Sequence, residues 1–198
     1  MNKFASNDYD SVAKFLHWSI ALMIFFNLAS GVVLVYFSEL STSLNLYEIH
    51  KQFGVFILLL AFIRLFWRIS HRYPKLSELP LSEAVLANFG VLLMYALMFA
   101  IPISGIYFTQ SYSHDVHILN FKLFQIISPQ PCAVSLQFLF LHKYLAILLA
   151  ALVAGHTLAA LKHHYLDRID ILRRMLPNLK RQKKWNSAVS GDYLIRHN

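Results

Sequence analysis

The sequence contains one cysteine and few charged residues. Cys132 is the only cysteine among 198 residues, which excludes an internal disulfide and a metal cluster held by several thiolates. Asp, Glu, Lys and Arg make up only 14% of the chain, compared with roughly 25% in a typical soluble domain. Hydrophobic residues make up 57%, and this excess predicts an integral membrane protein. The first residues lack the basic start and cleavage site of a secretory signal, so we expect no processing there.

Acidic residues are almost absent from the four longest apolar stretches, where Glu48 is the only one and lies at an end. A metal transporter would need acidic or thiol groups along a pore, so this class is disfavoured. Each stretch is long enough to cross a bilayer, which takes about 20 residues. We therefore predict an all-α, integral membrane four-helix bundle. The expected helices are 12–37, 47–69, 83–111 and 137–165, within one domain over residues 1–177, followed by a basic tail at 178–198.

Basic residues are concentrated in alternate loops. Nine of the 18 Lys and Arg residues follow Leu161, and four more lie between residues 64 and 83. The other two loops hold one, Lys122. The positive-inside rule then places both termini in the cytoplasm and the first and third loops outside. The net charge of +8 is explained by these segments and by contact with anionic lipid rather than by a nucleic-acid partner.

Four histidines lie inside the apolar stretches, where an ionisable side chain predicts a functional site. His142 and His156 are fourteen residues apart, which is almost four helical turns and about 21 Å, so both leave the same helix face. With the predicted topology, His17 shares the inner depth of His156, and His50 shares the outer depth of His142. Two imidazoles at one depth could hold the iron of a b-type haem from both sides. The sequence thus predicts two haems stacked across the membrane.

Packing and surface roles are the alternatives for these residues. A single histidine in an apolar helix is often a hydrogen-bonded packing residue, and a zinc or copper site would need three or four ligands at one depth. Gly31, Gly54 and Gly155 would let a macrocycle approach the backbone, or they are helix-packing residues. Arg64, fourteen residues after His50, would pair with a haem propionate, or it is an interfacial positive-inside charge.

His163 follows His156 by seven residues, so it lies about two helical turns nearer the cytoplasm. Its position suits a quinone or proton site below the inner haem. The alternative is an interfacial histidine that stabilises the helix C-terminus.

Six motifs give the chain a resemblance to a known family. They are AKFLHW, IHKQFG, IRLFWR, AIPISG, LHKYLA and GHTLAALKHHY, followed by IDILRRMLP. Over about residues 9–177 the chain resembles the bacterial cytochrome b561 family, the small four-helix, di-haem branch related to hydrogenase cytochrome b subunits. The resemblance implies two haem b groups with His17, His50, His142 and His156 as axial ligands.

The resemblance also implies a function in electron transport, with a quinone as redox partner. One class of members oxidises superoxide and reduces ubiquinone, which leaves superoxide oxidase as an alternative to a plain electron carrier. A third possibility is a haem-bearing membrane anchor of a larger dehydrogenase or hydrogenase, with an outer redox protein as donor. The chain departs from the family at Asn88 and Val91, where many members have histidines, and in the outer loop 113–135. These departures concern the third helix and the donor surface, not the four ligands.

Overall fold

The computed structural model describes residues 8–71, 74, 79–119 and 121–176. Four long helices dominate them: α1 (Ser11–Tyr36), α3 (Leu46–Ser70), α4 (Leu81–Ser111) and α5 (Cys132–Tyr165). The short elements are α2 (Ser38–Ser43), β1 (His117–Ile118), β2 (Phe121–Lys122) and α6 (Ile171–Met175). All four long helices are long and apolar enough to cross a membrane. The predicted all-α architecture with four membrane-spanning helices is therefore confirmed.

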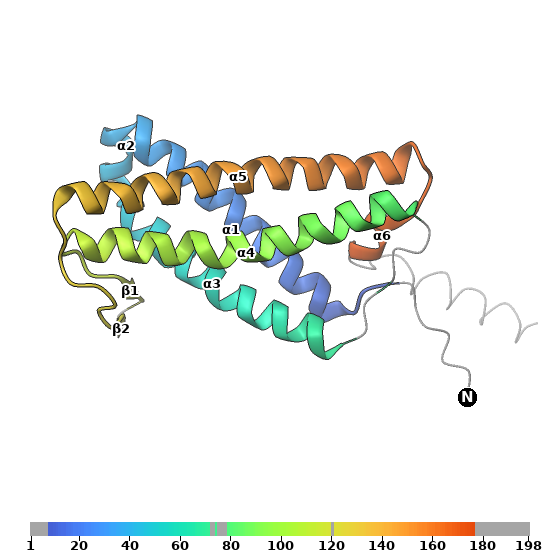
Figure 1. Ribbon diagram of the computed structural model, residues 1–198, viewed down its shortest axis with the longest axis horizontal. Helices are drawn as coiled ribbons and strands as arrows, with labels where there is room; N and C mark the ends of the chain where they lie inside the picture. The colour runs from blue at the N-terminus through green and yellow to red at the C-terminus, as the bar shows by residue number, and fades with distance from the viewer. Residues whose placement is uncertain (1–7, 72–73, 75–78, 120, 177–198) are drawn as a thin grey trace, which may run out of the picture.

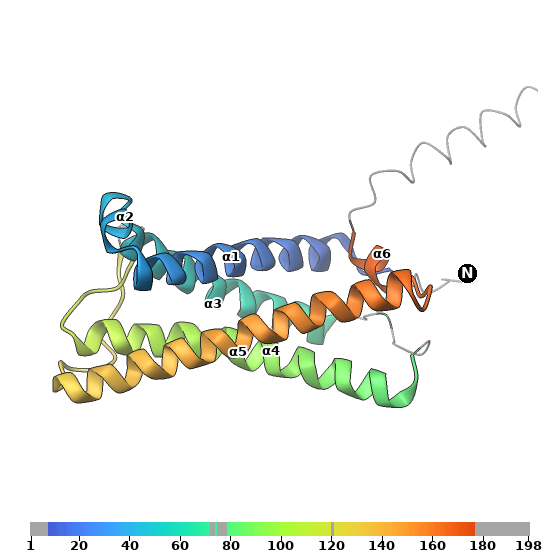
Figure 2. The ribbon, with the colours of Figure 1, turned by 90° about the horizontal axis from the view of Figure 1, so that it is seen from above.

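The helices form a bundle of two layers. Figure 2 shows α1 beside α3 in one layer and α4 beside α5 in the other, and α3 packs on α4 between the layers. The short elements lie at the two ends of the bundle (Figure 1). We call the end with α2, β1 and β2 the hairpin end, and the opposite end, where α6 lies, the α6 end.

The residues before each helix explain where the helices begin. Asp10 caps α1, because its side chain accepts a hydrogen bond from the Ala13 backbone N–H at 2.8 Å. Pro80 and Pro131 immediately precede α4 and α5, and their extended backbone suits the residue before a first turn. The fourth long helix starts at Cys132, five residues before the predicted start at 137, because the prediction counted residues up to Leu136 as part of the outer loop and did not use Pro131 as a start signal. The other predicted helix ends differ from the structure by at most two residues.

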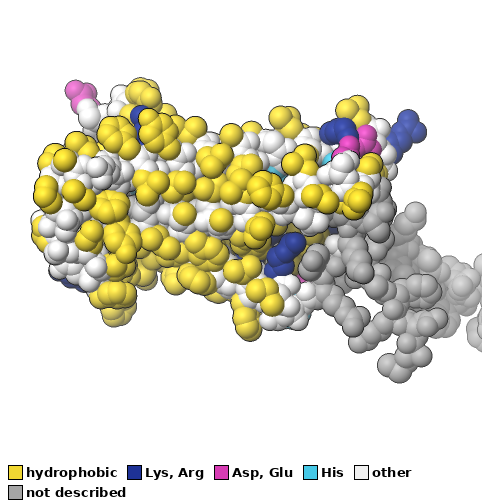
Figure 3. All heavy atoms as spheres, viewed as in Figure 1, with side chains coloured by type: hydrophobic (Ala, Val, Ile, Leu, Met, Phe, Trp, Pro, Cys, Tyr) yellow, Lys and Arg dark blue, Asp and Glu magenta, His cyan; other side chains and the backbone are white. Residues whose placement is uncertain are grey.

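The core is small and the surface is apolar. The main buried cluster lies mid-bundle and includes Ile20, Ile57, Ala61 and Leu149. Large hydrophobic side chains cover the outside of the helices, and Figure 3 shows them over most of one face. Soluble monomers rarely expose apolar patches of this extent, so this surface faces lipid. The predicted tail at 178–198 lies outside the described residues.

Candidate functional site

The structure brings the four intramembrane histidines together in two pairs. His50 of α3 faces His142 of α5 near the hairpin end, with ring centroids 6.1 Å apart. His17 of α1 faces His156 of α5 nearer the α6 end, with ring centroids 6.4 Å apart. These are the pairs that the depth argument expected. Helix α5 contributes one imidazole to each level, fourteen residues apart.

The spacing of the rings suits one metal ion per pair. An imidazole nitrogen binds a first-row metal at about 2.0–2.1 Å, so two imidazoles on opposite sides of one ion have ring centres roughly 6 Å apart. Both observed separations are close to this value. Each pair supplies only two ligands. An octahedral metal ion has six coordination positions, so the other four would be filled by a bound group. This arrangement fits a metal that is carried by a planar macrocycle.

Hydrogen bonds fix the orientation of both rings at the hairpin end. The Nδ1 atom of His142 lies 2.9 Å from the Ile101 carbonyl oxygen and 3.2 Å from Ser104 Oγ. A carbonyl can only accept, so His142 Nδ1 carries the proton. Ser30 Oγ donates to the Asn27 carbonyl at 3.0 Å and lies 2.8 Å from His50 Nδ1, which makes this Nδ1 the donor as well. In both rings the unprotonated Nε2 is left to bind a metal.

A large cavity surrounds this pair. Its volume is about 740 Å³, its lining is mainly apolar, and it reaches between α1, α3, α4 and α5. This is within the range of about 300–1,000 Å³ that is usual for ligand and cofactor sites. His50 and His142 both line the cavity, so a ligand there would meet both imidazoles.

Three glycines keep space open in the cavity wall. A Cβ at Gly31 would lie 3.6 Å from His50 Cε1, and one at Gly54 would lie 3.6 Å from Asn27 Nδ2. Gly105 is tighter, since its Cβ would lie 3.1 Å from His142 Cε1 and 3.2 Å from Nδ1. A side chain at residue 105 would therefore displace the ring. Gly155, which the sequence also singled out, has no atom within 4 Å of such a Cβ among the described residues.

The comparisons with known proteins point to the same chemistry. The family profile described as prokaryotic cytochrome b561 matches residues 8–178. The chain belongs to this cytochrome b561 family. It is 28% identical over 178 residues to "Cytochrome b561 homolog 1" of Escherichia coli (strain K12), which covers 88% of this chain and 99% of that protein. It is 30% identical over 173 residues to "Cytochrome b561 homolog 2" of the same organism, covering 85% and 90%.

Membership makes this chain a membrane electron-transfer protein with b-type haem. Its residues fit that cofactor on three counts. The imidazoles are paired at the spacing of an axial ligand set, both hairpin-end rings present Nε2, and a cavity with glycine walls surrounds them.

Arg64 of α3 lies at the level of the second histidine pair, His17 and His156. Its charge acts on both His17 and His156. Nε donates to the Tyr95 hydroxyl at 3.1 Å, whereas Nη1 is buried with no hydrogen-bond partner among the described residues. An orphaned guanidinium N–H is costly in a membrane protein, and a carboxylate beside it would remove that cost. The sequence prediction that Arg64 pairs with a propionate remains a prediction that this geometry favours.

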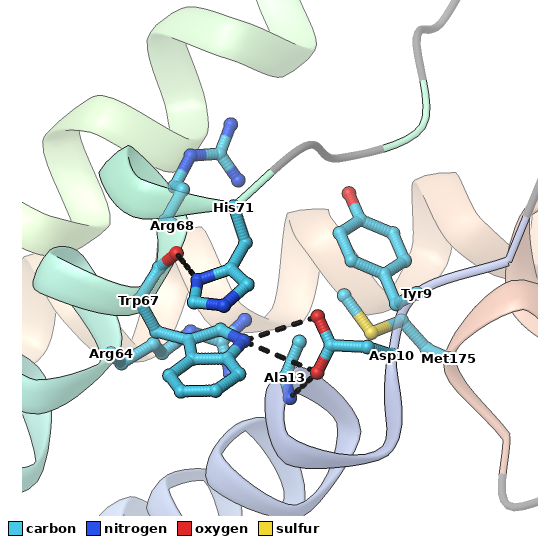
Figure 4. A pocket seen from close by; sticks show the side chains of 8 residues that line it. All are labelled: Tyr9, Asp10, Ala13, Arg64, Trp67, Arg68, His71 and Met175. Atoms are coloured by element: carbon cyan, nitrogen blue, oxygen red, sulfur yellow. Dashed lines mark hydrogen bonds between the residues drawn. The ribbon is translucent and has the colours of Figure 1, made fainter. Parts of the chain in front are cut away.

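A cluster of side chains at the α6 end holds α1 against α3. Figure 4 shows the Asp10 carboxylate accepting both the Trp67 indole N–H, at 3.1 and 3.2 Å, and the Ala13 backbone N–H. His71 stacks on Trp67 with ring centroids 3.8 Å apart. Arg64 lines the same small pocket, whose volume is about 30 Å³. Burial raises the pKa of Asp10, but these hydrogen bonds outweigh it and bring the pKa below its usual value.

An ionic network joins the ends of α4 and α5 nearby. Lys162 Nζ lies 3.1 Å from Glu83 and 2.9 Å from Asp167, and His163 Nδ1 lies 2.7 Å from Asp167. Hydrogen bonds from Lys162 and His163 hold the pKa of the Asp167 carboxyl below its usual value. The buried His163 is thus part of the helix terminus, which favours the structural alternative for this residue over a quinone site.

Four residues that contact the site were not predicted from the sequence. Ser30, Ser104, Gly105 and Tyr95 were not singled out, although Ser104 and Gly105 belong to the AIPISG motif. Their importance comes from contacts with other helices, which spacing along one helix does not show. Ser30 precedes Gly31 on α1, and its role depends on how α1 and α3 pack.

Proposed function

We propose that this cytochrome is a di-haem electron carrier that moves electrons across the bacterial inner membrane, to or from a quinone. The observation that carries the proposal is the pair of facing imidazoles at each of two levels, spaced for one iron per level. Fourteen residues of α5 separate the levels, which is about 21 Å of helical rise. Two relay positions at this separation would cover most of the hydrocarbon core, which is about 30 Å thick.

Each part of the site has a role in this proposal. His50 and His142 hold one haem, and His17 and His156 hold the other. Ser30, Ser104 and the Ile101 carbonyl fix the ring orientation and tautomer of the hairpin-end ligands. Arg64 balances the charge of a propionate. The haem supplies reversible one-electron chemistry at its iron, and the protein supplies binding, orientation and tuning of the potential.

The hairpin end faces the outside in this proposal. The positive-inside rule supports that orientation, because the basic residues described towards the other end are Arg64 and Arg68 of α3 with Lys162, Arg168, Arg173 and Arg174. Electrons from an outer donor would then reach the His50–His142 level first.

The charges at the hairpin end favour a carrier over a superoxide oxidase. A superoxide oxidase needs a positive outer surface to steer the anion. Of the three outer lysines, Lys51 is paired with Glu48 at 2.6 Å and Lys122 with Asp115 at 2.8 Å, which leaves only Lys143 without an ion pair among the described residues. We therefore favour a donor that is not recognised by a basic patch.

A haem count on the purified protein tests the proposal. A pyridine haemochrome assay should give two b-type haems per chain, and the optical spectrum should be that of low-spin, six-coordinate iron, because both axial positions are imidazole. One haem per chain would contradict the two-level architecture, and none would contradict haem binding altogether.

A further inference from the structure

The hairpin between α4 and α5 is folded back against the side of the bundle. β1 and β2 are antiparallel, with His117 opposite Lys122 and Ile118 opposite Phe121. At its base, Val116 is only 2% exposed and packs in one cluster with Val55 of α3 and Ile106 of α4. Beside it, the Asp115 carbonyl accepts a hydrogen bond from Lys51 Nζ at 3.1 Å. These contacts keep the hairpin against α3 and α4 instead of projecting beyond the helix ends.

The packing of Val116 fixes the depth of the hairpin in the membrane. The midpoint of α4 is residue 96, because the helix runs from Leu81 to Ser111. Ile106 lies ten residues from that midpoint, which is about 15 Å of helical rise. Half the hydrocarbon thickness of a bilayer is also about 15 Å. Val55, in the same cluster, lies only three residues from residue 58, the midpoint of α3. Val116 therefore packs within the membrane-spanning length of both helices, not in bulk water beyond it.

Three large apolar side chains of the hairpin are exposed. Phe121 is 78% exposed, Phe124 76% and Leu119 63%. Figure 3 shows apolar side chains on the hairpin side of the molecule that continue the apolar surface of the helices. Lys122, between these residues, is exposed and ion-paired with Asp115. Phe and Leu side chains beside a lysine suit the membrane interface, where the apolar groups contact acyl chains and the ammonium reaches the headgroups.

We propose that this hairpin inserts Leu119, Phe121 and Phe124 into the interface of the leaflet that surrounds the His50–His142 level. The occupant of this apolar surface is lipid, because Val116 packs within the membrane-spanning length of α3 and α4 and the surface is continuous with the lipid-facing surface of these helices. The inserted hairpin stays next to His50 through the contact of Lys51 with Asp115. It thereby closes the flank of α3 and α4 to water. The inference does not depend on haem binding.

Site-directed spin labelling of the full chain in lipid nanodiscs tests this insertion. Cys132 is the only cysteine, so the single change Cys132→Ser gives a background for one nitroxide at a time, at Phe121→Cys and at Phe124→Cys. The measurement is the ratio of collisions with oxygen, which concentrates in acyl chains, to collisions with a water-soluble nickel chelate. Tyr144→Cys, 65% exposed on α5, is the lipid reference, and Ser128→Cys, exposed in the same loop, is the water reference.

The insertion predicts oxygen-to-nickel ratios at residues 121 and 124 several-fold above that at residue 128 and approaching that at residue 144. Both labels replace exposed side chains, so the packing of Val116 is kept, and elution as a single species confirms that each variant is folded. Ratios equal to that at residue 128 would overturn the proposal and identify the face as water-exposed and free for a protein partner. Low collision rates with both reagents would also overturn it, because the residues would then be packed against protein.

Discussion

At the residue scale, the two histidine pairs differ in their surroundings. His50 and His142 each donate from Nδ1 to a neutral oxygen, which in the proposed haem would raise the basicity of the ligand and stabilise oxidised iron. His17 and His156 lie near the positive charge of Arg64, which would stabilise reduced iron because the reduced form carries less positive charge. If both haems are present as proposed, both effects would make the potential at the His17–His156 level the higher one. Electrons would then move downhill from the hairpin end to the α6 end.

Substitution of Arg64 tests this asymmetry. Arg64→Ala should leave both haems bound and lower only the potential of the His17–His156 haem. A hydrogen bond to a charged group contributes about 1.5–3 kcal/mol, which corresponds to roughly 60–130 mV for a one-electron couple. Arg64→Lys, which keeps the charge, should shift it less. A redox titration in which the other haem moves instead would contradict the position of Arg64.

Gly105 provides a test at the hairpin-end ligands. Gly105→Ala should displace the His142 ring, because the new Cβ would lie 3.1 Å from Cε1. We expect loss or high-spin conversion of the haem at that level in the electron paramagnetic resonance spectrum, with the other haem unchanged. Gly90→Ala is the matched control on the same helix, since no described atom lies within 4 Å of its Cβ. Two unaltered low-spin signals in Gly105→Ala would show that the ring has more room than the packing indicates.

At the element scale, apolar length predicts the helices but not how they begin or touch. The four stretches give the four helices because backbone groups in a bilayer must be paired internally. The first five residues of α5 were assigned to the preceding loop, because the start signal at Pro131 was not used. The fourteen-residue spacing of His142 and His156 shows that they share a face. It does not show that Ser104 or Ile101 of α4 would meet His142, which depends on how α4 packs on α5.

The start of α1 is an element whose stability can be measured. Asp10→Ala should lower the midpoint of thermal unfolding in detergent, because an N-cap side chain contributes about 1 kcal/mol and the Trp67 hydrogen bonds are lost with it. Asp10→Asn keeps an acceptor oxygen and should stay close to the native protein. An equal loss in both variants would show that the charge matters rather than the cap.

The same carboxyl gives α1 a pH dependence. The pKa of Asp10 is lowered from 3.8 in the folded protein. Its stabilisation is therefore complete above the ordinary carboxyl pKa and is lost as the pH falls through the lowered value.

At the scale of the whole molecule, the sole cysteine reports the orientation in the membrane. Cys132 is exposed at the hairpin end, so a membrane-impermeant maleimide should label it in intact spheroplasts. In the control, Cys132→Ser with Leu166→Cys moves the thiol to the α6 end, where Leu166 is well exposed. That variant should react only after lysis. The reverse pattern would place the hairpin end in the cytoplasm and contradict the loop-charge argument.

The pairing of the histidines is the central claim, and double variants test it most directly. His50→Ala with His142→Ala should retain one low-spin haem, and so should His17→Ala with His156→Ala, because each removes both ligands of one level. His50→Ala with His156→Ala removes one ligand from each level and should leave no intact low-spin haem. Haem content and the electron paramagnetic resonance spectrum of the three variants measure this. One intact haem in the mixed variant, together with loss of both haems in His50→Ala with His142→Ala, would contradict the pairing.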